Sequence, residues 1–180
     1  LWMIDATGAL TLDGMTITRG AGKNGGAIRN AGKLTLINMT FNDNTAEFGG
    51  AIFNSGMLSI ENSQFNTNHA QFGGAIYNQS TLTISNSTFT GNEASMTAGD
   101  LAKSLGQADN PQESGGAIFT IGNTTITDSL FENNRASWGG GAVANDEAGK
   151  LTISTSRFLN NSADKGGAVS HVSGEEYDHL

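Results

Sequence analysis

A repeat made of two alternating words runs through almost the whole chain and constrains its fold more than any other feature. The first word is Gly-Gly-Ala-Ile or Gly-Gly-Ala-Val, and its copies begin at Gly25, Gly49, Gly73, Gly115, Gly140 and Gly166. The second word is Phe-x-x-Asn, and its copies begin at Phe41, Phe65, Phe89, Phe131 and Phe158. The first three copies lie 24 residues apart. Such a period indicates stacked supersecondary units, none of which can bury its apolar face alone.

One repeat contains three short runs of alternating apolar and polar residues. In the unit from Gly50 to Gly74 these runs lie at 51–54, at 58–60 and around Phe65, with turn residues between them. Alternation bounded by turns is typical of strands, and strands this short are stable only when they pair with equivalents in neighbouring coils. Parallel connections favour a right-handed path. The sequence therefore predicts an all-β fold, a right-handed single-stranded parallel β-helix (β-solenoid) with about 24 residues per coil, three faces and six to seven coils.

Residue type is constant along several columns of the aligned repeats, which predicts the side chains that point inward. The inward columns are Ile28, Ile52, Ile76, Ile118, Val143 and Val169; Phe41, Phe65, Phe89, Phe131 and Phe158; and Ala46, Ala70, Ala94, Ala136 and Ala163. Thr35, Ser59 and Thr83 are expected to face solvent. Two asparagine columns are expected to stack their amides into ladders: Asn30, Asn54, Asn78 and Asn145, and Asn44, Asn68, Asn92, Asn134 and Asn161. Thr120 and His171 replace asparagine in the first of these columns.

Charge and cysteine content narrow the class of protein. The chain has a net charge of −8 with only nine Lys and Arg residues, scattered singly, so it lacks the basic cluster that binding to nucleic acid requires. It contains no Cys, which excludes a disulfide framework and is compatible with export through a membrane. We expect residues 1–180 to form a single β-helix segment of a longer protein. One insertion, residues 95–114, interrupts the repeat as a loop, and its sequence is compatible with a short helix.

Many β-helices are polysaccharide lyases or glycosidases, so the column positions of the acidic residues bear on catalysis. Glycoside hydrolysis needs two carboxylates that face one sugar, but Asp43 aligns with Thr67, and Glu61 aligns with Ser85. The three histidines share no metal-ligand spacing. The sequence thus predicts no catalytic residue, no metal site and no cofactor, although a lyase or glycosidase β-helix stays open as an alternative.

Aromatic residues recur at two further positions of the repeat. Phe53, Tyr77 and Phe119 occupy outward positions of successive first strands, while Phe48, Phe72 and Trp138 precede the glycines. Aromatic side chains on a rigid face can stack on sugar rings or anchor a protein partner. These six residues are therefore the predicted binding residues. The alternative is that they cover one another along the solenoid, and the sequence favours neither interpretation.

The two linked words resemble the repeat signature of the chlamydial polymorphic outer-membrane proteins, from about Gly8 to Ala168. The resemblance implies a β-helical passenger of a bacterial surface protein, secreted by an autotransporter-like route, located at the outer membrane or cell surface, and acting as an adhesin. The implied partners are a host-cell or matrix surface, through glycan or protein, and neighbouring copies of the chain. Contact with the membrane itself would come only through an anchor outside this segment. A purely structural stalk or filament module is the other alternative.

Overall fold

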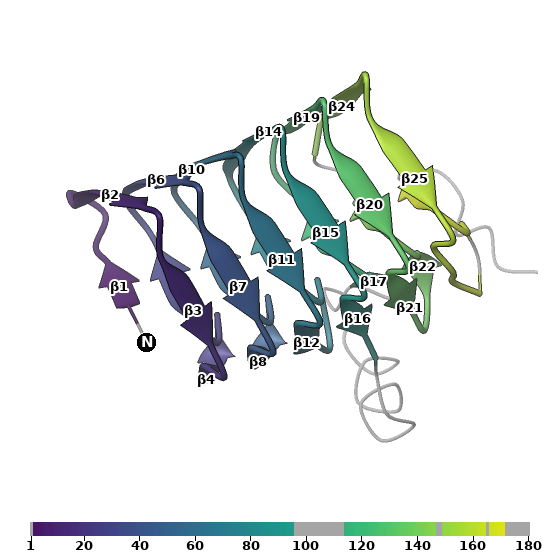
Figure 1. Cartoon of the computed structure of the whole chain (residues 1–180), viewed down its shortest axis with the longest axis horizontal. Coiled ribbons are helices and arrows are strands. Elements are labelled where there is room, and N and C mark those ends of the chain that lie inside the picture. The colour runs from purple at the N-terminus through teal and green to yellow at the C-terminus, as the bar shows by residue number, and fades with distance from the viewer. Residues whose placement is uncertain (1, 96–113, 147–148, 165, 172–180) are drawn as a thin grey trace, which may run out of the picture.

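The computed structural model describes residues 2–95, 114–146, 149–164 and 166–171, which wind into one continuous parallel solenoid (Figure 1). The described residues contain strands and no helix, and every strand pairing is parallel. Successive coils lie side by side along the longest axis, from the N-terminal coil at one end to the β24–β25 coil at the other. The predicted β-solenoid of about six turns, with coils about 24 residues apart, is confirmed.

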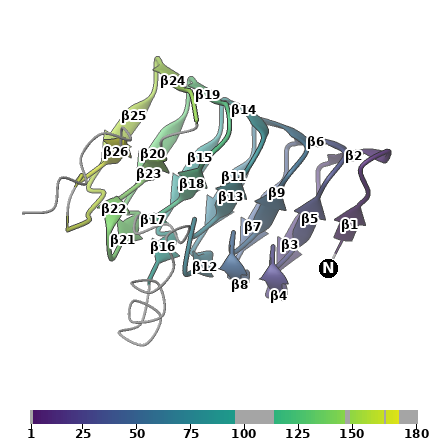
Figure 2. The same ribbon diagram turned by 180° about the vertical axis from the view of Figure 1, so that it is seen from behind.

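Each coil contributes one strand to each of three long sheets. The first sheet contains β1 (Trp2–Ile4), β5 (Ile28–Asn30), β9 (Ile52–Asn54), β13 (Ile76–Asn78), β18 (Ile118–Thr120), β23 (Val143–Asn145) and β26 (Val169–His171). The second contains β2 (Ala9–Asp13), β6 (Lys33–Ile37), β10 (Met57–Glu61), β14 (Thr81–Ser85), β19 (Thr124–Thr127) and β24 (Leu151–Ser154). The third contains β3 (Thr16–Thr18), β7 (Thr40–Asn42), β11 (Gln64–Asn66), β15 (Thr88–Thr90), β20 (Leu130–Glu132) and β25 (Arg157–Leu159). Figure 2 shows the first sheet from behind.

A fourth, shorter sheet departs from the three-faced coil that the sequence predicted. It contains β4 (Ala21–Asn24), β8 (Thr45–Phe48), β12 (His69–Ala70), β16 (Glu93–Ala94) and β21 (Arg135–Ala136). A further pair, β17 (Ser114–Gly115) and β22 (Gly139–Gly140), lies next to it in the chain. The sequence missed this sheet because its strands are only two to four residues long and therefore show too little alternation to be recognised.

The core is a set of identical side chains stacked between coils. Ile28, Ile52, Ile76 and Ile118 are fully buried. The phenylalanine column forms a continuous stack in which Phe65 lies 4.8 Å from Phe41 and 4.6 Å from Phe89 between ring centroids. The predicted inward columns are therefore confirmed through the central coils. Of the positions expected to face solvent, Ser59 and Thr83 are exposed, while Thr35 is half-buried.

The asparagine ladders also form, and they satisfy polar groups at the bends. The amide of Asn68 donates from Nδ2 to Oδ1 of Asn92 at 2.9 Å and to the carbonyl of Phe41 at 3.0 Å, and this pattern continues to Asn161. In the other ladder, Asn54 Nδ2 donates to Asn78 Oδ1 at 2.7 Å. Buried polar atoms are costly when unpaired, so each rung stabilises the stacking of two coils.

The first asparagine ladder is broken where threonine replaces asparagine. Asn78 Nδ2 donates to the hydroxyl of Thr120 at 3.0 Å, but no bond continues from Thr120 to Asn145 among the described residues. Asn145 Oδ1 is consequently buried with no hydrogen-bond partner in the described part of the chain. The register itself is kept, because Thr120 pairs with both Asn78 and Asn145 in the first sheet.

A serine ladder was not predicted from the sequence. The hydroxyl of Ser87 accepts from the backbone N–H of Ser63 at 3.1 Å and donates to the carbonyl of Ser85 at 2.8 Å. Ser129 and Ser156 repeat this arrangement. A column alignment would have revealed the row, since serine recurs at the same position of each central repeat.

The paired glycines of the repeat have two separate backbone roles. Gly49, the first of its pair, has a φ of 64°, a left-handed conformation that side-chain-bearing residues rarely adopt. Gly50, the second, packs so tightly that a Cβ there would overlap the carbonyl oxygen of Gly74 in the next coil. The pair therefore makes the sharp, close-packed corner between the fourth sheet and the first sheet.

Candidate binding site

Four of the six predicted binding residues are buried, Phe72 (3% exposed) and the three of the first sheet, which corrects the expectation of an exposed aromatic face. Only 8% of Phe53, 5% of Tyr77 and none of Phe119 is exposed to solvent. With Phe72 and Ala144 they form a second apolar cluster, separate from the core between the sheets. Their side chains point away from the core, as predicted, but outward does not mean exposed here. Their binding role stays a prediction, and alanine substitutions there are expected to cost stability.

The cover of this cluster comes from the aromatic residues that precede the glycines. Phe48 packs edge-on against Tyr77, with 5.2 Å between ring centroids, and Phe72 lies 6.2 Å from Phe119. Within each row the rings stack, at 5.3 Å for Phe48 and Phe72 and at 5.4 Å for Phe53 and Tyr77. The row of Phe48 and Phe72 therefore covers the row of Phe53, Tyr77 and Phe119. The geometry supports the interpretation that the two aromatic rows cover one another.

Burial changes the ionisation of the phenol in this cluster. Desolvation raises the pKa of Tyr77, a hydrogen bond with Gln79 partly offsets this rise, and the charge of Asp146 adds to it. The phenol is thus held in its neutral form, in keeping with a structural role for the ring.

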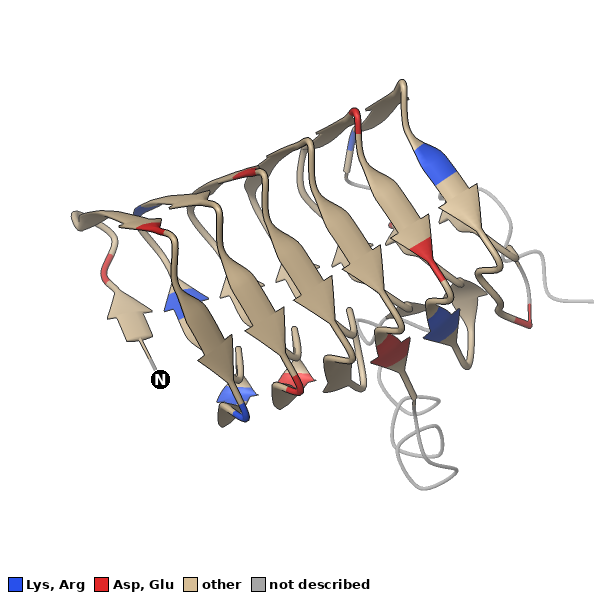
Figure 3. Cartoon of the chain, viewed as in Figure 1, with Lys and Arg blue, Asp and Glu red and all other residues tan. Residues whose placement is uncertain are grey.

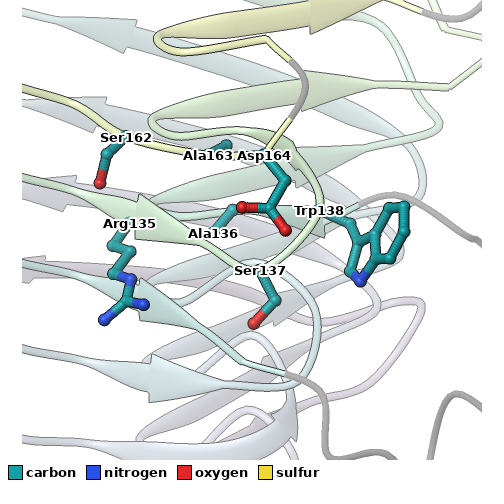
Figure 4. Close-up of a pocket in the computed structure, with 7 residues that line it drawn as sticks. All are labelled: Arg135, Ala136, Ser137, Trp138, Ser162, Ala163 and Asp164. Atoms are coloured by element: carbon teal, nitrogen blue, oxygen red, sulfur yellow. The ribbon is translucent and has the colours of Figure 1, made fainter.

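Trp138 is the exposed member of the six predicted residues, with 36% of its surface accessible. It follows β21 and lines an open pocket of about 540 Å³ together with Arg135, Ala136, Ser137, Ser162, Ala163 and Asp164 (Figure 4). Arg135 and Ser162 are bridged as parallel neighbours, so the pocket spans two successive coils. Sequence reasoning identified Trp138 but missed the polar residues around it, since each of them is ordinary in isolation.

The backbone around Trp138 is fixed by the end of the insertion. Ser114 donates to the carbonyl oxygen of Trp138 from its backbone N–H at 3.0 Å and from its hydroxyl at 2.8 Å. Ser95, on the other side of the insertion, contacts His69 through its hydroxyl at 3.2 Å. Within 95–114 only these two serines are described, so the predicted short helix lies outside the described residues.

Acidic residues of the described part are spread singly over the coils (Figure 3). Glu61 has Ile37 and Ser85 as its ladder neighbours, and Glu132 lies between Thr90 and Leu159. No adjacent coil places a second carboxylate beside either of them. Nor do the described residues contain a group of three or more His, Asp or Glu side chains suited to holding a metal ion.

Comparison with known families agrees with the geometry. The family model described as a right-handed β-helix region matches residues 2–106, which is more than half of the chain. The chain therefore belongs to that family. The Chlamydia polymorphic membrane protein repeat matches residues 128–146. No curated protein and no solved structure matches the chain. Across the described residues, no helix has the length and apolar character needed to cross a bilayer. The two matches together are typical of a β-helical segment from a protein associated with a membrane surface.

Proposed function

We propose that the chain is a displayed segment of a bacterial cell-surface protein and acts there as an adhesin-like binding rod. The observation that carries this proposal is the membrane-protein repeat at residues 128–146 within a parallel β-helix. Export would follow an autotransporter-like route. The partners would be a host-cell or matrix surface, recognised through glycan or protein, and neighbouring copies of the chain.

The physical properties of the fold support binding over catalysis. A solenoid holds side chains at a fixed spacing on a rigid axis, and repeated weak contacts gain avidity without a catalytic centre. The described carboxylates are isolated from one another along the columns, whereas hydrolysis of a glycoside requires a facing pair. A stalk or filament module would use the same rod without a ligand.

Surface display is tested on intact bacteria that express the full-length gene. An antibody raised against the folded chain should label intact and permeabilised cells equally, and externally added protease should remove the signal. Labelling that requires permeabilisation would reject surface display. Turnover of a polysaccharide by the purified chain would reject the adhesin proposal and favour a lyase or glycosidase.

A further inference from the structure

The Trp138 pocket lies where the chain departs from its own repeat. Arg135 stands in the ladder position that Glu93 and His69 occupy in the preceding coils. Gly139 occupies the position of Phe48 and Phe72, directly before the Gly-Gly-Ala word, and Trp138 lies one residue earlier. Repeated residues build the scaffold, so a concentration of departures on one pocket is the pattern expected of a binding site.

Among the described residues, none pairs with the charged groups of the pocket. The described residues contain an ion pair between Lys23 and Glu47, at 3.8 Å, but the side chains of Arg135 and Asp164 make no ion pair or hydrogen bond with any described residue. In Figure 4 the carboxylate of Asp164 is drawn above Ser137, with the Trp138 ring to the right and the guanidinium of Arg135 to the left. With respect to the described residues, the pocket therefore offers an unpaired carboxylate and an unpaired guanidinium beside one flat aromatic ring.

These groups match the two kinds of surface that a sugar ring presents, one apolar and one polar. A pyranose presents an apolar C–H face, which the Trp138 indole can cover, and a rim of hydroxyls, which carboxylates and guanidinium groups bind strongly. Ser137 and Ser162 add hydroxyls that both donate and accept. A volume of about 540 Å³ lies within the range of small-ligand sites and accommodates one or two sugar rings.

We propose that this pocket binds a neutral saccharide, with Trp138 stacking on the ring and Asp164 and Arg135 hydrogen-bonding its hydroxyls. The proposal rests on the binding function proposed above and names its ligand. A neutral sugar fits better than an acidic one because Asp164 lines the pocket, Glu93 is the ladder neighbour of Arg135, and the whole chain carries a net charge of −8.

The test is a titration of the intact chain with neutral mono- and oligosaccharides, chosen by a glycan array. Replacing Trp2 with phenylalanine leaves Trp138 as the sole tryptophan, so its emission should shift as the sugar binds. In calorimetric titrations, which do not depend on tryptophan emission, Trp138→Ala and Asp164→Asn should each weaken binding about tenfold or more, as expected for loss of a stacking or charge-assisted contact. Trp2→Ala, which removes the other exposed tryptophan (43% exposed), is the matched control and should bind normally.

Several outcomes would overturn the assignment. They are the absence of any neutral ligand on the array, a preference for acidic glycans or for peptides, and an Asp164→Asn variant that binds like the parent chain. Far-UV circular dichroism of each variant separates lost binding from lost folding. If beads coated with the Asp164→Asn variant still adhere to cells, this pocket is rejected as the saccharide site while the proposed adhesive function stands. Beads that never adhere would reject that function instead.

Discussion

Replacing Phe65 with alanine should lower the free energy of unfolding by about 4–5 kcal/mol, the upper part of the range for buried phenylalanine truncations. Phe65 is fully buried, and its ring stacks on both neighbours, with centroids 4.8 Å from Phe41 and 4.6 Å from Phe89. The substitution therefore leaves a cavity between two rings and removes two aromatic contacts, each worth about 0.5–1.5 kcal/mol beyond the area that it buries.

The assay is urea denaturation followed by far-UV circular dichroism, with the slope of the transition compared between variants. Phe158→Ala is the matched control, because Phe158 is only half-buried and, among the described residues, stacks on Phe131 alone, at 4.9 Å. Its cost should be about half that of Phe65→Ala, since it loses one ring contact and less buried area. Equal costs for the two variants, or a cost for Phe65→Ala below about 1 kcal/mol, would refute the account of the phenylalanine stack.

Two further predictions concern the polar ladder and the aromatic cluster. Thr120→Asn combined with Thr124→Leu restores the consensus of the ladder and gives the unpaired Asn145 Oδ1 a donor. The free energy of unfolding should therefore rise by about 1 kcal/mol in the same assay. A less stable double variant would contradict the cost assigned to the unpaired Asn145 oxygen. Because the pKa of Tyr77 is raised by burial, the unfolded chain should lose the phenol proton at about pH 10 while the folded chain retains it. The free energy of unfolding should therefore fall as the pH rises above about 10. In a Tyr177→Phe variant, an absorbance titration should show that Tyr77 ionises at a higher pH than an ordinary tyrosine. Ionisation at the ordinary pKa would contradict the burial of Tyr77.

The fold was predictable because the repeat keeps the same residue type at equivalent positions of successive coils. A column such as Ile28, Ile52 and Ile76 is uniform in type, and only an inward position on stacked coils requires that uniformity. The asparagine ladders followed from the same argument, including the two substituted positions. Within the central coils the residue type at a position therefore determined its environment.

The sequence left open whether the aromatic face is exposed, because alternation along a strand gives direction and not exposure. Phe53 and Tyr77 point away from the core, yet the short fourth sheet brings Phe48 and Phe72 against them. A signal was present in the sequence: two aromatic rows flank the glycine pair and recur in the same coils. Paired rows on either side of a sharp corner indicate rings that pack together.

The pocket at Trp138 could be predicted only in part. The tryptophan stood out as an aromatic residue, but Arg135 and Asp164 lie in successive coils and far apart in residue number. Their proximity depends on the register of the Arg135–Ser162 bridge, which begins after the repeat length has drifted from 24 residues. The column of Ala136 and Ala163 keeps this register in the sequence, but a column alignment does not show which outward side chains line a pocket.

Adhesion of the folded chain to a surface tests the central claim most directly. Beads coated with the chain should attach to host cells or to extracellular matrix and resist detachment under flow, because many copies on one bead combine weak contacts into avidity. Beads coated with the heat-unfolded chain are the control and should not attach. If beads coated with the folded chain attach no better than the control beads on every cell type and matrix component tried, the claim that the solenoid is an adhesive rod is contradicted.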